Sequence, residues 1–158
     1  MLKTTIESLR VLKYSPNGGF CAGVWRGAVP GLNRALVDAD GAPRPALRAV
    51  EAALQPLLAT VYPATSTLPA RSTAHLAVHI CNDLTTDQDV QIEATITDQR
   101  GVATRTWRGV VQADSVEFIS DIGIRGGRIG DQMTVDLRVR DMPTGAVRSE
   151  NSYAFTAT

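Results

Sequence analysis

The sequence predicts a mainly β protein, a seven-stranded β-sandwich preceded by a helix–strand–helix segment. Two observations carry this prediction. After residue 56, short segments alternate apolar and polar residues between turn signals, as in all-β domains. Before that point, residues 3–14 and 46–55 place apolar residues at helical spacing, on either side of a short apolar run. The chain has 158 residues, and we expect two domains, residues 1–56 and 57–158.

The first helix is expected over residues 3–14. Its apolar face is formed by Leu2, Ile6, Leu9 and Leu12. The polar residues Lys3, Glu7 and Arg10 face away from it, which predicts that they are exposed to solvent. Pro16 cannot continue a helix, and Asn17-Gly18-Gly19 tolerates positive φ, so a sharp reversal is expected there.

The run Phe20–Trp25 is short, apolar and uncharged, which is typical of a strand buried on both faces. Residues 26–33 contain Gly27, Pro30 and Gly31 and are expected to form a loop. The segment Leu32–Val37 is either a short strand or part of the same loop.

A second helix is expected over Ala46–Gln55, just after Pro43 and Pro45. Proline is well tolerated in the first helical turn, because the N–H that it lacks would have no helical partner there. The buried stripe of this helix is expected to be Leu47, Val50 and Leu54.

Seven strands follow, and this number within about a hundred residues predicts an immunoglobulin-like sandwich. They are Leu58–Tyr62, His75–Cys81, Asp89–Thr97, Val102–Val111, Ser115–Ile124, Met133–Arg140 and Ala146–Thr156. Trp107 is expected to be the core aromatic residue, and Tyr153 and Phe155 close the domain. Asp98-Gln99-Arg100-Gly101 is expected to be a hairpin turn.

Charge and cysteine content exclude several classes of partner. Lys and Arg total 16, as do Asp and Glu, so nothing indicates nucleic-acid binding. We identify no signal peptide and no apolar run long enough to span a membrane, so no membrane partner is expected and the compartment stays open. Cys21 and Cys81 lack the spacing of a metal or redox site, and both are expected to be reduced and buried.

Two segments of the sequence resemble family 2 glycoside hydrolases, the β-mannosidase and β-galactosidase group. Lys13-Tyr14-Ser15-Pro16-Asn17-Gly18-Gly19-Phe20 is similar to the turn that leads into the last strand of the family's catalytic (β/α)8 barrel. Residues 36–47, with Pro43-Arg44-Pro45, look like the entry into the final barrel helix. The resemblance implies that residues 1–56 are the end of such a barrel and that residues 57–158 are the sandwich that follows it.

The resemblance also implies that this part of the family is not catalytic. A retaining glycosidase needs two carboxyl groups, about 5–5.5 Å apart. In the family these are glutamates on earlier barrel strands, before the matching region. Glu7 is the only glutamate ahead of the expected last strand, and we interpret it as a solvated surface residue. No catalytic residue, metal ligand or cofactor site is therefore predicted.

Trp25 and Arg26 are the candidate substrate-binding residues. They end the expected barrel strand, and active sites of such barrels lie at the carboxyl ends of the strands. An indole ring there can stack on a sugar, and a guanidinium can donate hydrogen bonds to hydroxyl groups. The alternative is that Trp25 is a core residue and Arg26 a loop cation. Ala22 departs from the family, many members of which have an aromatic residue there.

The remaining polar clusters are interpreted as structural. His75 and His79 lie four residues apart on one strand, about 13 Å, which is too far for one metal ion. Asp83, Asp87 and Asp89 surround a turn without an EF-hand pattern. Arginines on strands alternate with acidic residues, which indicates a mixed-charge solvent face.

Two functions are compatible with these observations. The chain is either the C-terminal, non-catalytic part of a glycosidase, or a standalone sandwich module that binds a carbohydrate or a protein. In the first case its partner is the rest of the barrel, which it completes and braces. Residues 1 to about 40 are then expected to be less stable than the sandwich, or to be covered by another copy of the chain.

Overall fold

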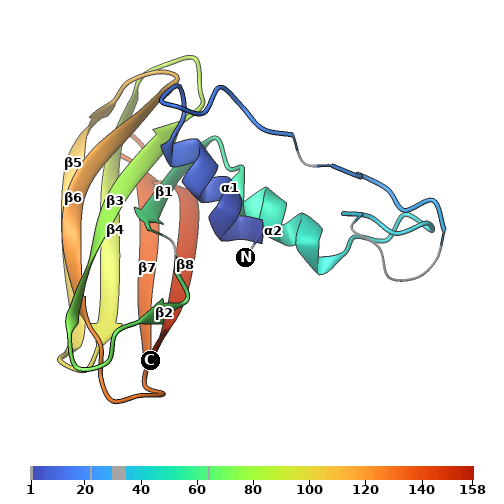
Figure 1. Cartoon of the computed structure of the whole chain (residues 1–158). Coiled ribbons are helices and arrows are strands. Elements are labelled where there is room, and N and C mark those ends of the chain that lie inside the picture. Colours follow the sequence, from blue (N-terminus) through green and yellow to red (C-terminus); the bar gives the residue numbers. More distant parts are fainter. Residues whose placement is uncertain (1, 22, 30–34, 64) are drawn as a thin grey trace. The chain divides into compact units, whose positions relative to one another are not determined.

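The computed structural model describes residues 2–21, 23–29, 35–63 and 65–158 (Figure 1). The chain divides into two compact units, Met1–Gln55 and Pro56–Thr158. The first unit contains the two helices, and the second contains all the strands.

The first unit is built on helices α1 (Leu2–Val11) and α2 (Pro45–Ala53), which pack against each other (Figure 1). Pro45 lies in the first turn of α2, as predicted, and Arg44 before it is extended. The small core of this unit consists of Ile6, Leu36, Val50 and Ala53. Among the described residues, a packed cluster of four buried apolar side chains is small for a folded unit of this length.

The prediction that Lys3, Glu7 and Arg10 are exposed to solvent is wrong. Glu7 is fully buried, and Lys3 Nζ lies 3.4 Å from its Oε1. Burial lowers the pKa of Lys3, and Glu7 acts against this shift. Arg10 is also buried, and its guanidinium donates to the carbonyls of Ala53 (2.5 Å) and Gln55 (2.9 Å) at the end of α2. These buried charges are tolerated because each has an ion-pair or hydrogen-bonding partner. The spacing of residues in α1 does not show that Arg10 reaches the end of α2.

The turn after α1 reverses sharply, as predicted, but the details differ. The helix ends at Val11, and the positive φ angles fall on Tyr14 (64°) and Gly19 (145°). Asn17 stabilises the end of the helix, since its Nδ2 donates to the carbonyl of Leu9 at 2.8 Å. Its Oδ1 accepts from the N–H of Gly19 at 3.2 Å.

The predicted buried strand Phe20–Trp25 is not a strand in this chain. Its described residues are exposed, with 58% of Val24 and 63% of Trp25 accessible to solvent. Val24 has a φ of 57°, which a strand does not allow and which is unfavourable for a β-branched residue. A strand buried on both faces needs a hydrogen-bonding neighbour on each side. The described residues supply one short neighbour, at Leu36–Val37.

The second unit is a β-sandwich, as predicted, and all seven predicted strands are present. An additional strand of two residues, β2, is too short for its alternation to be recognised. The strands are β1 (Leu57–Tyr62), β2 (Thr67–Leu68), β3 (Thr73–Asn82), β4 (Gln88–Asp98), β5 (Gly101–Val111), β6 (Ser115–Arg125), β7 (Gln132–Asp141) and β8 (Val147–Ala157).

The eight strands form two sheets (Figure 1). One sheet has the order β1-β3-β6, and the other has the order β2-β8-β7-β4-β5. All pairs are antiparallel except β2 with β8. Strands β5 and β6 are therefore edge strands of different sheets.

The core of the sandwich lies between the two sheets and follows the predicted alternation. Leu76, Val78 and Ile80 point inward from β3, and every second residue of β4 and β7 does the same. Tyr153 and Phe155 are buried, but Trp107 is only partly buried against this cluster. Trp107 is therefore a peripheral residue on edge strand β5, and Phe155 is the largest fully buried side chain among the described residues.

The two cysteines differ in environment. Cys81 is buried, as predicted, whereas Cys21 is exposed. Cys21 lies in the segment that was expected to be a buried strand. It is exposed for the same reason as Trp25, because the described residues supply only one short neighbour to this segment.

Replacing Phe155 by alanine should lower the free energy of unfolding of the sandwich by about 3–5 kcal/mol, because it leaves a cavity in a dry, close-packed layer. Phe118→Ala is the matched control. Its ring is 58% exposed, so its removal should change the free energy by less than about 1 kcal/mol. Urea denaturation followed by circular dichroism measures both values. Equal destabilisation by the two variants would contradict the assignment of the core.

The hairpin predicted at residues 98–101 connects β4 and β5, and the carboxylate of Asp98 accepts several hydrogen bonds there. Gly101 has a φ of 113°. Asp98 accepts hydrogen bonds from the Arg100 guanidinium and from the N–H groups of Arg100 and Arg125, at 2.6–3.3 Å. Burial alone would raise the pKa of Asp98, but these donors lower it to about 2.

Asp98→Asn should therefore destabilise the sandwich in a pH-dependent way. The folded pKa of Asp98 lies below the ordinary 3.8, so its stabilising contribution is complete above about pH 4 and is lost as the pH falls toward about 2. Near neutral pH the loss should be about 1–3 kcal/mol. Urea titrations of both proteins across this range test the prediction. Asp136→Asn, which alters an exposed carboxylate on β7, is the control and should change the free energy of unfolding near neutral pH by less than about 1 kcal/mol.

Candidate functional site

The predicted site residues Trp25 and Arg26 lie in a short parallel ladder. The N–H of Leu36 donates to the carbonyl of Val24 (3.2 Å), and that of Val37 donates to the carbonyl of Trp25 (2.9 Å). The N–H of Gly27 donates back to Val37 at 2.9 Å. These three bonds hold the backbone of Trp25 and Arg26 against residues 36–37.

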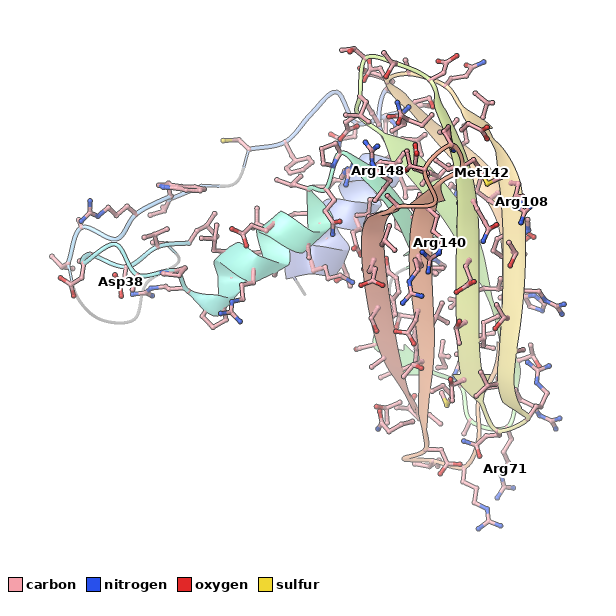
Figure 2. All side chains as sticks on the ribbon, turned by 180° about the vertical axis from the view of Figure 1, so that it is seen from behind. Asp38, Arg71, Arg108, Arg140, Met142 and Arg148 are labelled. Atoms are coloured by element: carbon pink, nitrogen blue, oxygen red, sulfur yellow. The ribbon has the colours of Figure 1, made fainter. Side chains whose placement is uncertain are left out.

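A turn at residues 38–42 fixes Arg26. Asp38 forms this turn, because its Oδ1 accepts from the N–H groups of Asp40 (3.0 Å) and Ala42 (2.8 Å). Nη2 of Arg26 donates to the carbonyl of Ala39 in the turn at 2.6 Å. Figure 2 shows Asp38 in the loops that precede α2.

The ladder and the turn together present an exposed indole and a guanidinium that is tied at one nitrogen. The indole ring of Trp25 is free to stack on a flat apolar surface such as a sugar face. Arg26 keeps N–H groups that are not used in the turn, since a guanidinium has five. Ala22, where the sequence departs from the family, and residues 30–33 of the expected loop lie outside the described residues.

Two carboxylates of the first unit, Glu7 and Asp38, have contacts within that unit. Glu7 is buried beside Lys3, so the interpretation of Glu7 as a solvated surface residue is wrong. Asp38 is engaged in its turn. Glycoside hydrolysis needs two carboxyl groups that both face the scissile bond.

The outer face of the five-stranded sheet carries a polar cluster that the sequence did not single out. Cross-strand pairing places Glu93, Arg138 and Glu150 in one row and Thr95, Asp136 and Ser152 in the next. They surround a shallow hollow of about 360 Å³. Nε of Arg138 donates to Glu150 at 2.7 Å, and Oγ of Ser152 donates to Asp136 at 2.6 Å.

This face has the mixed charge that the sequence predicted. Figure 2 shows Arg108 and Arg140 on it. Trp107 is half-buried, and by register it pairs with the inward-pointing Ile92, so its ring lies on the core side of the sheet. The described side chains of this face thus give a sugar no aromatic platform.

Aromatic residues cluster instead on the three-stranded sheet. His79 contacts Tyr62 (centroids 6.4 Å apart) and Phe118 (5.6 Å), both in edge-on geometry. His79 was expected to be exposed but is half-buried between these rings, and burial lowers its pKa. His75 on the same strand is exposed, as predicted. Perpendicular rings do not form the flat surface on which a sugar stacks.

The described residues contain no group of three or more His, Cys, Asp or Glu side chains that could hold a metal ion. Among them, neither helix is long and apolar enough to cross a membrane.

Comparison with known proteins identifies the fold. No protein-family model matches the sequence, and no curated protein matches it either. Among solved structures, a β-D-mannosidase from Dictyoglomus thermophilum superposes with a TM-score of 0.78 and 18% identity over 98% of this chain. An exo-chitosanase from Amycolatopsis orientalis gives a TM-score of 0.77 and 15% identity over 99% of it.

In both cases the chain spans 18% of the length of the solved protein. The matched region is a C-terminal domain of family 2 glycoside hydrolases. The resemblance inferred from Lys13–Phe20 and from residues 36–47 is thereby confirmed for the fold. The β-sandwich prediction is confirmed by the same superposition.

Proposed function

We propose that this chain is the C-terminal, non-catalytic part of a larger glycosidase that cleaves O-glycosyl bonds and resembles β-mannosidases. Its first unit completes the catalytic (β/α)8 barrel, and its sandwich braces that barrel. The observation that carries the proposal is the superposition of 98% of the chain on 18% of a β-D-mannosidase. Because nearly the whole chain superposes on a small share of that enzyme, the superposition favours the interpretation of this chain as one part of a larger protein.

The surface of the first unit supports this proposal. Residues 14–29 expose large apolar side chains, which a self-contained unit would bury. They are Tyr14, Phe20, Val24, Trp25 and Val29. Neighbouring barrel strands from the rest of the polypeptide would cover these side chains and would supply the hydrogen-bonding partners that residues 20–25 need as a strand.

The carboxylates also support a non-catalytic role. Described carboxylates in the first unit are buried with a lysine, engaged in a turn or placed on helix surfaces. In the proposed parent, the acid and the nucleophile are glutamates on earlier barrel strands. This chain would contribute Trp25 and Arg26 to the rim of the active site, where barrel enzymes bind their substrates.

The purified chain should not hydrolyse aryl β-mannosides or aryl β-galactosides above the buffer background, because it lacks the acid and the nucleophile. A chromogenic assay measures this directly. The polypeptide encoded together with the upstream reading frame is the positive control and should be active. Turnover by the purified chain would contradict the non-catalytic role. An upstream frame without seven preceding barrel strands would contradict the proposed parent.

Within that longer polypeptide, Trp25→Ala should raise KM for the aryl glycoside by about tenfold, which corresponds to about 1.4 kcal/mol of lost stacking. The melting temperature should change little, since 63% of the ring is exposed. Phe118→Ala, an exposed aromatic residue of the sandwich, is the matched control and should leave KM unchanged. An unchanged KM in Trp25→Ala would remove Trp25 from the substrate site.

A further inference from the structure

We propose that the end of the sandwich at which β4 and β6 finish is an oxyanion-binding site, which takes a phosphate, sulfate or carboxylate group. Four arginines from three separate segments meet there: Arg71, Arg100, Arg125 and Arg128. They line a hollow of about 630 Å³ together with Gln99 and Asp131. Figure 2 shows Arg71 at the opposite end of the sandwich from Met142.

The loops that carry these arginines are locked together by their backbones. The N–H of Arg71 donates to the carbonyl of Gly127 (2.9 Å), and the N–H of Gly126 donates to Ser72 (2.8 Å). Arg71 has a φ of 56°, an unfavourable value for arginine that this reciprocal pair maintains. A Cβ at Gly126 would lie 2.2 Å from the carbonyl oxygen of Pro69, so only glycine fits there. The guanidiniums therefore project from a defined frame.

The two carboxylates at this end, Asp98 and Asp131, already accept hydrogen bonds from the protein. Asp98 accepts from Arg100 and from two backbone N–H groups. Asp131 accepts from the N–H of Arg128 at 2.8 Å. Within the described part of the chain, the guanidiniums of Arg71, Arg125 and Arg128 have no hydrogen-bonding or ion-pair partner. Four cations thus face two carboxylates, or three if the α-carboxylate of Thr158 is also present, since its backbone oxygen accepts from Ala70.

The geometry favours an anion that several guanidiniums share. Arginine presents paired N–H groups that match the oxygens of phosphate, sulfate and carboxylate, and such charge-assisted bonds are about twice as strong as neutral ones. Uncompensated arginines that converge on one hollow repel each other, and a bound oxyanion removes this repulsion. The site is far in the sequence from Trp25 and Arg26, and the inference does not depend on the proposed glycosidase role.

Titration of the ¹⁵N-labelled chain with inorganic phosphate, followed by ¹H–¹⁵N NMR, tests the proposal. Sodium chloride at matched ionic strength is the salt control. Saturable shifts are expected at the Arg Nε–H groups of this end and at the N–H groups of Gly126 and Gly127. An oligogalacturonate and a neutral mannan, titrated in the same way, distinguish a free ion from an acidic glycan as the source. Binding of either phosphate or oligogalacturonate supports the site, and binding of neither overturns it.

The double variant Arg71→Gln/Arg128→Gln should weaken phosphate binding by about tenfold or more, because it removes two of the four charged donors. The charge-matched control is Arg48→Gln/Arg140→Gln, which alters α2 and the outer face of β7 and should bind as the original chain does. Dispersion of the NMR spectrum verifies that each variant is folded. Equal weakening by both variants would reduce the effect to net charge, and weakening by neither would place phosphate binding away from Arg71 and Arg128. Either result would overturn the site.

Discussion

The packing of apolar side chains between the two sheets is the interaction on which the rest of the sandwich depends. It forms because side chains in β3, β4 and β7 alternate strictly, and because the register of each antiparallel pair places the apolar half of both partners on the same face. A shift of one residue in β4 would expose Ile92 and bury Glu93, at a cost of several kcal/mol. The loops at both ends can therefore vary while the frame stays fixed.

The first unit is under the opposite constraint. Its core of four buried apolar residues is small, and it depends on polar contacts such as those of Arg10 with the carbonyls at the end of α2. Its exposed apolar side chains are those expected of a segment that barrel neighbours would cover. Such a segment keeps its helices, which satisfy their own hydrogen bonds, and loses its strand, which cannot.

The candidate site at Trp25 and Arg26 and the proposed anion site around Arg71 use arginine differently. Arg26 is fixed by one carbonyl beside an exposed indole, an arrangement suited to neutral hydroxyl groups. The arginines around Arg71 have backbone-locked loops and few counter-charges, an arrangement suited to an anion. Neutral and charged ligands would thus be bound at separate places, which is why the proposed anion site can be tested apart from the glycosidase role.

The sequence by itself determined the two helices and the seven long strands of the sandwich, because each depends on a period that a single segment displays: two residues for Val90–Ile96 and about 3.6 for α2. Its family resemblance also indicated the fold. Tertiary structure decided what depends on partners distant in the chain. Arg10 is buried because its guanidinium reaches carbonyls at the end of α2. Trp107 is peripheral because β5 is an edge strand, and Val24 and Trp25 are exposed because the described neighbours are too few. Likewise, no local pattern shows that Arg71, Arg100 and Arg128 converge, since three loops must first close over the same end of the sandwich.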